Sequence, residues 1–164
     1  MAFHPLGLLD PSQGDSVRRI LQNSMETLER IGPEWWCGYS YSWVGGMWAR
    51  MGDGERAAAA LRDFAQCFCL KNSFHANGDQ SRSGKSNFTY RPFTLEGNMA
   101  FASSLQEMLL QSHTGTVRIF PAIPPSWKDV SFRTLRTEGA FLVSAAMRDD
   151  KVSEVKVRST VGGP

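Results

Sequence analysis

The sequence predicts an α-then-β chain, in which helices are followed by antiparallel strands. Apolar residues recur at helical spacing up to about residue 113, and from residue 116 onward they alternate with polar residues. The last helical segment before this change is strongly amphipathic, and the turn Glu96-Gly97-Asn98 leads directly into it. We therefore expect a helical domain over residues 1–113 and the truncated start of a β-domain over residues 114–164.

Composition and charge limit the class of protein. Hydrophobic residues make up 41% of the chain and charged residues 21%, which is typical of a globular protein. The formal charge is only +2 and no Lys/Arg cluster is interleaved with aromatics, so nucleic acid is not an expected partner. No apolar run reaches about 18 residues, so we expect no membrane span. The cysteines are odd in number, which favours free thiols over disulfides or a metal site: Cys37, Cys67 and Cys69.

The first element is an irregular loop over residues 3–14, which contains two prolines and two glycines. His4 is the only titratable group in the apolar part of this loop. A helix then begins with Asp15 or Ser16 as its N-cap and ends at Gly32-Pro33. Its apolar residues keep one face for four turns: Val17, Ile20, Leu21, Met25, Leu28 and Ile31.

The next segment contains six aromatic residues within fourteen positions, more than one buried helix face explains. They are Trp35, Trp36, Tyr39, Tyr41, Trp43 and Trp48. Trp43, Met47 and Met51 continue on a helical face, whereas Gly45 and Gly46 each weaken that helix by about 1 kcal/mol relative to Ala. We expect these two glycines to let another helix or a ligand approach closely.

A tight turn at residues 52–54 follows, with Asp53 as a cap, and a second helix runs over residues 55–70. The two helices form an αα-hairpin, a unit of both solenoids and closed toroids, and the pattern does not choose between these architectures. Residues 71–91 are polar and lack periodicity, as in a site lid, a binding loop or a disordered segment. His75 lies in this insert and is a weaker candidate ligand-contacting residue.

The amphipathic helix after this insert places four apolar residues on one expected buried face: Ala102, Leu105, Met108 and Leu109. Glu96 lies just before its first turn, where a carboxylate meets unpaired N–H groups and the positive end of the helix dipole. Glu96 is therefore either a simple N-cap or a functional acid.

Strands are expected over residues 116–123, 130–134, 140–147 and 152–158, with a hairpin turn at Asp149-Asp150-Lys151. Prolines at 121, 124 and 125 restrict the first strand to an edge or a strand end.

Four sequence blocks resemble, in the same order, the C-terminal portion of family 95 glycoside hydrolases, which include α-L-fucosidases and α-L-galactosidases. FHPLGLLDP (3–11) resembles the family's SHLYGLYPG-type loop, and WCGYSYSWVGGMWARMGDGERA (36–57) resembles its TGWS…W…ARLGDGERA hairpin. Residues 92–127 resemble PFQIDGNFG…EMLLQSH…LPALP, and residues 135–152 resemble the start of the family's terminal β-domain.

This resemblance implies the last helical hairpins of an (α/α)6 barrel followed by a partial antiparallel β-sandwich-like domain. It also implies inverting hydrolysis of a terminal α-L-fucose or related L-sugar from an oligosaccharide or glycan, without a cofactor or metal. Glu96 stands where the family has its base aspartate and is one methylene longer. His4 matches a histidine expected to contact the sugar, and we expect further substrate contacts from Trp35, Trp36, Tyr39 and Asn98.

The family's general-acid glutamate lies upstream of the residues present here, so the resemblance implies a fragment that is inactive without the missing upstream part of its own barrel. A periplasmic or secreted bacterial parent would fit. The alternative is a non-catalytic carbohydrate-binding or scaffolding module, in which Glu96 only caps a helix.

Overall fold

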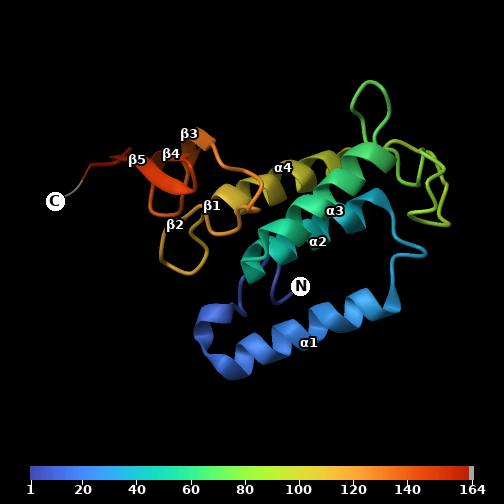
Figure 1. Ribbon diagram of the computed structural model, residues 1–164, viewed down its shortest axis with the longest axis horizontal. Coiled ribbons are helices and arrows are strands. Elements are labelled where there is room, and N and C mark those ends of the chain that lie inside the picture. Colours follow the sequence, from blue (N-terminus) through green and yellow to red (C-terminus); the bar gives the residue numbers. More distant parts are fainter. Residues whose placement is uncertain (163–164) are drawn as a thin grey trace.

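The computed structural model describes residues 1–162 and confirms that helices are followed by antiparallel strands (Figure 1). A 3-10 turn, Pro11–Gln13, precedes the first helix. The helices are α1 (Asp15–Ile31), α2 (Gly38–Met51), α3 (Gly54–Cys67) and α4 (Leu95–Leu109). The strands are β1 (Leu110–Gln111), β2 (Arg118–Ile119), β3 (Val130–Arg136), β4 (Phe141–Arg148) and β5 (Lys151–Ser159).

Helix α1 has the predicted bounds but not the predicted cap. Gly14 occupies the N-cap position and no side chain caps this terminus, so the expectation that Asp15 or Ser16 caps the helix is wrong. Gly32 ends the helix with a positive φ of 83°, as its sequence position predicts. Leu21 and Met25 are buried, whereas Ile20 and Ile31 of the expected apolar face are exposed.

Helices α2 and α3 form the predicted αα-hairpin. Gly52 ends α2 in the left-handed conformation, and the Asp53 carboxylate accepts a hydrogen bond from the Arg56 N–H at 2.9 Å, which confirms its capping role. A β-carbon at Gly45 would lie 2.9 Å from the Leu61 side chain of α3, and one at Gly46 would lie 2.7 Å from Ser104 Oγ of α4. The two glycines therefore allow other helices to approach α2 closely, which was one of the two expected reasons for glycine at these positions.

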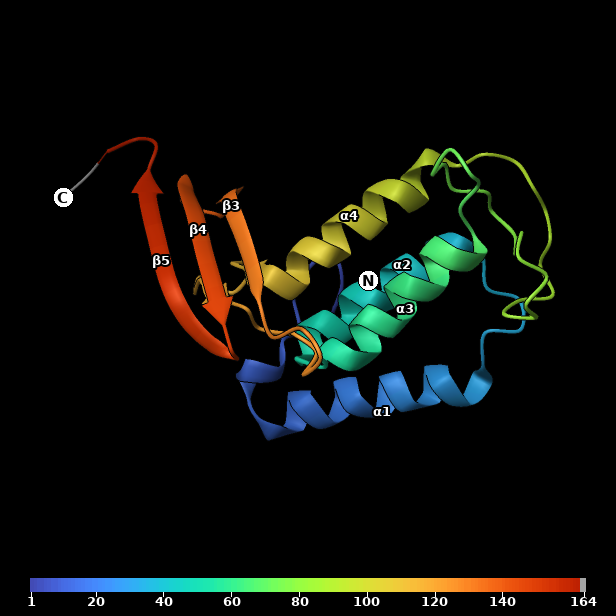
Figure 2. The ribbon, with the colours of Figure 1, turned by 45° about the horizontal axis from the view of Figure 1, so that its top comes forward.

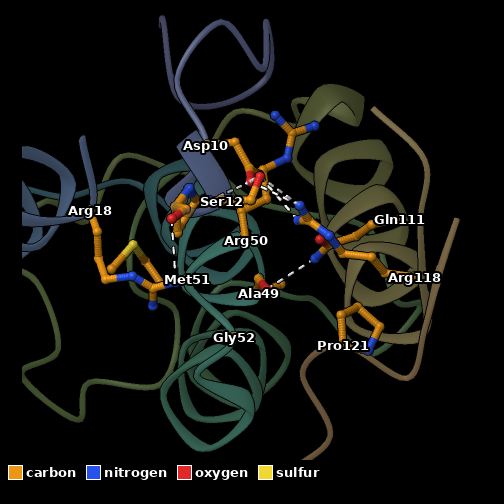
Figure 3. A pocket seen from close by; sticks show the side chains of 11 residues that line it. Asp10, Ser12, Arg18, Ala49, Arg50, Met51, Gly52, Gln111, Arg118 and Pro121 are labelled. Atoms are coloured by element: carbon orange, nitrogen blue, oxygen red, sulfur yellow. Dashed lines mark hydrogen bonds and ion pairs between the residues drawn. The ribbon is translucent and has the colours of Figure 1, made fainter. Parts of the chain in front are cut away.

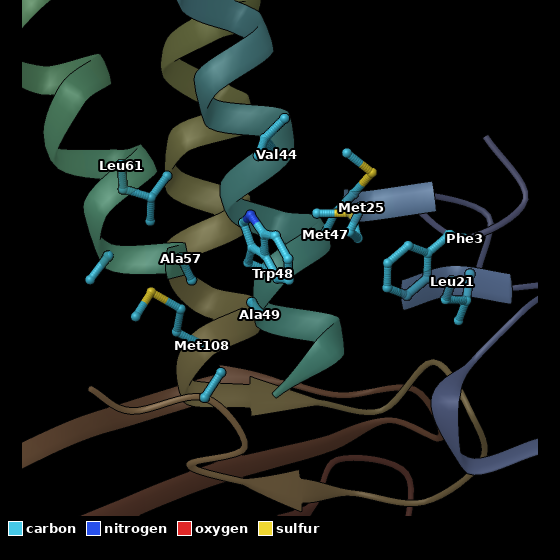
Figure 4. Packing of buried hydrophobic residues seen from close by; sticks show 12 residues of the cluster. Phe3, Leu21, Met25, Val44, Met47, Trp48, Ala49, Ala57, Leu61 and Met108 are labelled. Atoms are coloured by element: carbon cyan, nitrogen blue, oxygen red, sulfur yellow. The ribbon is translucent and has the colours of Figure 1, made fainter. Parts of the chain in front are cut away.

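The main core surrounds α2 (Figure 4). Trp48 and its neighbours face α3 and α4 on one side and the N-terminal segment with α1 on the other. Burial of these apolar side chains holds the four helices together. The residues labelled in Figure 4 are Phe3, Leu21, Met25, Val44, Met47, Trp48, Ala49, Ala57, Leu61 and Met108.

The buried face of α4 agrees with the predicted one at Met108 and differs from it elsewhere. Gly97, Ser104 and Met108 are buried, whereas Ala102 is exposed and Leu105 is half-buried. Ser104 faces α2 because its hydroxyl donates a hydrogen bond to the Ser42 carbonyl at 2.7 Å. A small polar residue thus occupies the contact between α2 and α4, and the pattern of apolar residues does not predict it.

The strands form a two-stranded ribbon, β1-β2, and a three-stranded antiparallel sheet, β3-β4-β5. The strand expected over residues 116–123 shrinks to Arg118–Ile119, and Phe120, just before Pro121, leaves the strand conformation with φ 54°. Asp149 and Asp150 both have positive φ and form the predicted turn between β4 and β5. Leu110, Phe132, Val143 and Ala145 make a second core between ribbon and sheet.

Figure 2 shows the sheet beyond one end of α4, with β5 at the outer edge. Among the described residues, no helix has both the length and the apolar character needed to cross a bilayer.

Candidate functional site

The first turns of α2 and α4 meet around the imidazole of His75, a residue of the polar insert. A β-carbon added to Gly38, the first residue of α2, would lie 2.2 Å from His75 Nε2. A β-carbon added to Gly97, in the first turn of α4, would lie 2.2 Å from His75 Nδ1. Neither glycine has a positive φ, so glycine is needed at both positions for space rather than for backbone conformation.

Glu96 belongs to this junction. It is the second residue of α4, and its side chain is exposed. Thr94 occupies the N-cap position and no side chain caps the terminus, so the interpretation of Glu96 as the N-cap is wrong.

Asn98 connects α4 to the insert. Its Oδ1 accepts a hydrogen bond from the His75 N–H at 2.9 Å, and its Nδ2 donates to the Ser73 carbonyl at 2.9 Å. Both ends of the amide are therefore used within the chain. A sugar hydroxyl would share or replace these hydrogen bonds.

The three aromatic candidates lie around the start of α2, next to Gly38. Trp35 is 67% exposed and Tyr39 is 40% exposed, so each offers ring surface to a ligand. Trp36 is half-buried and packs edge-on against Tyr41, with ring centroids 5.3 Å apart. Because Gly38 and Gly97 both contact His75, this aromatic group lies on the same end of the helices as Glu96.

The structure does not bring His4 to Glu96. His4 is 7% exposed and lies between α2 and α4, where its Nε2 would be 2.8 Å from a β-carbon at Gly46. The same β-carbon position lies 2.7 Å from Ser104 Oγ, which places His4 near Ser104. Ser104 is two turns, or about 12 Å, along α4 from Glu96.

The burial of His4 gives a testable pH dependence. Burial, and next the charge of Arg50, lower the pKa of His4 to about 4, whereas an unfolded histidine titrates near 6.5. Between these two pH values the unfolded chain binds more protons than the folded chain. The contribution of His4 to the free energy of unfolding is therefore complete above about pH 6.5, and it decreases by about 1.4 kcal/mol for each unit by which the pH is lowered. We expect the stability difference between the parent chain and His4→Gln to shrink by roughly 3 kcal/mol between pH 7 and pH 4.

Urea unfolding at pH 7, 6, 5 and 4 measures this difference. The carboxyl of Asp10 loses its contribution only as the pH falls below about 4, so its effect is separable. If the difference in free energy of unfolding between the two proteins is constant over this pH range, His4 is not a buried, neutral imidazole in the folded chain.

At the opposite ends of α2 and α4, charged side chains surround a pocket of about 280 Å³ (Figure 3). Asp10 is buried, which opposes its ionisation, but hydrogen bonds from Arg118 and Ser12 outweigh burial and hold its pKa below the usual range. Arg118 pairs with Asp10 through both carboxylate oxygens, at 2.9 and 3.2 Å.

Arg50 lies beside this pocket and pairs in bidentate fashion with Glu107 of α4, at 2.7 and 3.2 Å. It also donates to the carbonyls of Phe3 and Pro5. Because these charges satisfy one another, we interpret this group as the anchor of the N-terminal segment rather than as a reaction site.

The sequence alone did not identify His75 as a buried residue or Arg50–Glu107 as an ion pair. Each contact joins residues that are distant in the chain, and no short motif reports it. Within residues 1–162, no group of three or more His, Cys, Asp or Glu side chains is arranged to hold a metal ion. Cys37, Cys67 and Cys69 are free thiols.

Comparison with known proteins bears on both the helical and the strand-forming part of the chain. Residues 1–109 match the family model described as the glycosyl hydrolase family 95 catalytic domain, and residues 111–164 match the family 95 C-terminal domain. The protein named Alpha-L-fucosidase 2 from Arabidopsis thaliana is 29% identical over 130 residues. That alignment covers 78% of this chain and 15% of the length of the plant protein.

Proposed function

Because this chain belongs to glycoside hydrolase family 95, we propose that it supplies the general-base side of an inverting exo-glycosidase site. The substrate is a terminal α-L-fucose, or a related L-sugar, on a glycan. The observation that carries this proposal is the position of Glu96, exposed in the first turn of α4 at the same end of the helices as the aromatic residues that precede and begin α2.

Inverting hydrolysis needs two carboxyl groups. One protonates the leaving oxygen, and the other removes a proton from a water molecule that attacks the opposite face of the sugar, across a gap of about 6.5–9.5 Å. We assign the second role to Glu96. The general acid belongs, in this proposal, to polypeptide outside these 164 residues, which is consistent with the chain spanning 15% of the plant relative.

The remaining candidates are assigned to binding. Trp35 and Tyr39 offer flat ring surface on which an apolar sugar face packs, and Trp36, which is half-buried, adds the exposed part of its side chain. Asn98 contributes by holding the insert or by exchanging one of its two hydrogen bonds for a hydroxyl. His4 would reach the sugar only through a different arrangement of the N-terminal segment when the upstream polypeptide is present.

The proposed architecture follows from the same family membership. Residues 1–113 are the last hairpins of an (α/α)6 barrel, and residues 114–164 begin a β-sandwich-like domain. Exposed apolar side chains on the first turns of α4, Leu95 and Met99, are consistent with a further helix packing there.

The test uses a polypeptide that continues upstream of Met1 into a family 95 catalytic region, called the extended enzyme below. We expect the extended enzyme to release the chromophore from a chromogenic α-L-fucoside and the 164-residue chain to release none. Hydrolysis by the chain alone would contradict the assignment of the general acid to other residues. An extended enzyme that folds but is inactive on α-L-fucosides and α-L-galactosides would contradict the proposed substrate.

Trp35 gives a second prediction for the extended enzyme. Because its ring is mostly exposed, we expect Trp35→Ala to change the free energy of unfolding by less than about 0.5 kcal/mol. Loss of the stacking surface should raise KM several-fold. Steady-state kinetics and urea unfolding check the two parts, and an unchanged KM would remove Trp35 from the binding site.

A second candidate function is supported by a different groove. An open depression of about 380 Å³ lies among α1, α2 and α3, with Trp36, Tyr41 and Trp48 beside charged groups that include Glu29 and Asp63. Aromatic rings bordered by polar groups also suit a non-catalytic carbohydrate-binding module. Fucose binding by the chain alone that survives Glu96→Gln and Trp35→Ala but not Trp36→Ala would favour this alternative.

A further inference from the structure

We propose that His75 is a positioning residue for Glu96: it joins the first turns of α2 and α4 and thereby fixes the direction of the carboxylate. This inference rests on the proposed function of Glu96 as the base. His75 comes from the polar insert, yet its side chain is fully buried, whereas Lys71, Asn72, Ser73 and Phe74 before it are exposed. The His75 Nε2 atom is buried without a hydrogen-bond partner, which is uncommon for a polar atom and needs a physical explanation.

Hydrogen bonds define the chemical state of the ring. Nδ1 lies 2.7 Å from the Thr94 carbonyl oxygen and 2.7 Å from Thr94 Oγ1. A carbonyl oxygen can only accept, so Nδ1 carries the proton and donates it. Nε2 is then an unprotonated nitrogen, and it is buried without a hydrogen-bond partner. Burial lowers the pKa of His75, although the bond to Thr94 and the charge of Glu96 oppose this shift.

The same residue holds the backbone of this turn. The His75 carbonyl accepts from the Thr94 N–H at 3.2 Å, and the His75 N–H donates to Asn98 Oδ1 at 2.9 Å. His75 therefore binds the N-cap residue of α4 and the residue that follows Gly97. Glu96 lies between these two attachment points, so its backbone direction depends on them.

Packing fixes the ring in a third way. The imidazole occupies the space that side chains at Gly38 and Gly97 would fill, and it lies against the Phe64 ring of α3, with centroids 5.2 Å apart. Three helices thus contact one small ring. Since Gly38 is flanked by the aromatic candidates and Gly97 by Glu96, the ring sets the spacing between binding surface and base.

This arrangement predicts a separation of kcat from KM. A misplacement of a reacting group by about 1 Å costs on the order of 100-fold in rate, because the attacking water is no longer aligned. His75→Asn keeps an amide N–H near the position of Nδ1, where it can donate to the Thr94 carbonyl. His75→Gln places its amide near the position of Nε2 and leaves that carbonyl without its side-chain donor.

In the extended enzyme we expect His75→Asn to keep kcat within about five-fold of the parent. We expect His75→Gln to lower kcat by roughly 100-fold with KM within about two-fold. His113→Asn is the control, because it removes a histidine bonded to Asp10 at the other end of α4 and should lower stability without lowering kcat. Equal kcat values for the Asn and Gln variants, or a loss confined to stability, would overturn the proposal.

A measurement on the 164-residue chain separates this inference from the proposed function. The Gly97 N–H donates to the Thr94 carbonyl at 3.3 Å, the same carbonyl that His75 Nδ1 binds. We expect His75→Gln, and not His75→Asn, to speed hydrogen exchange of the Gly97 and Thr94 amides at least ten-fold relative to that of Leu105. Unchanged exchange would overturn the positioning role whatever the activity of Glu96. Faster exchange in His75→Gln, together with an unchanged kcat in Glu96→Gln, would instead show that only the proposed function had failed.

Discussion

Glu96→Gln is expected to lower kcat of the extended enzyme on an α-L-fucoside by 10²- to 10⁴-fold, the usual contribution of a general base. Gln keeps the size and hydrogen-bonding shape of the side chain but cannot take a proton from water. Because Glu96 is exposed on a helix without a capping role, we expect KM and the free energy of unfolding to change little. Initial rates and urea unfolding measure these three quantities.

Glu96→Asp is the matched variant. Aspartate retains a carboxylate that can act as the base, and it is the residue type that the family resemblance places at this position. Its side chain is about 1 Å shorter, so we expect a changed kcat that remains well above that of Glu96→Gln. Glu26, an exposed glutamate of α1, provides a surface control as Glu26→Gln, with no expected effect. Full activity of Glu96→Gln would remove this residue from the mechanism.

Arg50→Met is expected to destabilise the 164-residue chain by roughly 3–5 kcal/mol, the usual cost of removing one member of a buried ion pair. The side chains of Arg50 and Glu107 are only 5% and 16% exposed, so methionine would leave the Glu107 carboxylate largely out of water without its arginine partner. The carbonyls of Phe3 and Pro5 would also lose the hydrogen bonds that Arg50 donates. Urea unfolding at pH 7 measures the loss.

Two comparisons test the cause of this loss. Lys156→Met breaks an ion pair with Glu154 whose side chains are 72% and 54% exposed, and it should cost less than about 1 kcal/mol. The double variant Arg50→Met/Glu107→Leu removes both buried charges and should be more stable than Arg50→Met alone. If Arg50→Met costs no more than Lys156→Met, the pair does not anchor the N-terminal segment.

Elements that local rules determine were predictable from the sequence. Gly32 ends α1, and Asp53 caps α3, because both act through backbone groups within a few residues. The two-residue turn between β4 and β5 likewise depends only on Asp149 and Asp150. Helix α3 ends at Cys67, before the expected Leu70, because the chain there pairs with the insert: the Ala76 N–H donates to the Phe68 carbonyl.

Features that depend on contacts between distant segments were not predictable. Ser104 is buried on α4 because it meets Ser42 of α2, and a hydropathy pattern assigns that place to an apolar residue such as Ala102. Glu96 lies at the start of α4, as predicted, although inside the first turn rather than just before it. The signal for His75 was the pair of glycines before Tyr39 and Asn98, whose missing side chains leave room for its ring, and a single sequence does not connect them to it.

The configuration of the first sugar released tests the account most directly. An α-L-fucoside hydrolysed by water that Glu96 activates on the opposite face must give β-L-fucose first. Proton NMR of the anomeric region, recorded during the first minutes of hydrolysis by the extended enzyme, distinguishes the two anomers before they interconvert. We expect the β-anomer to form first, and initial formation of α-L-fucose would contradict the assignment of Glu96 as the base of an inverting site.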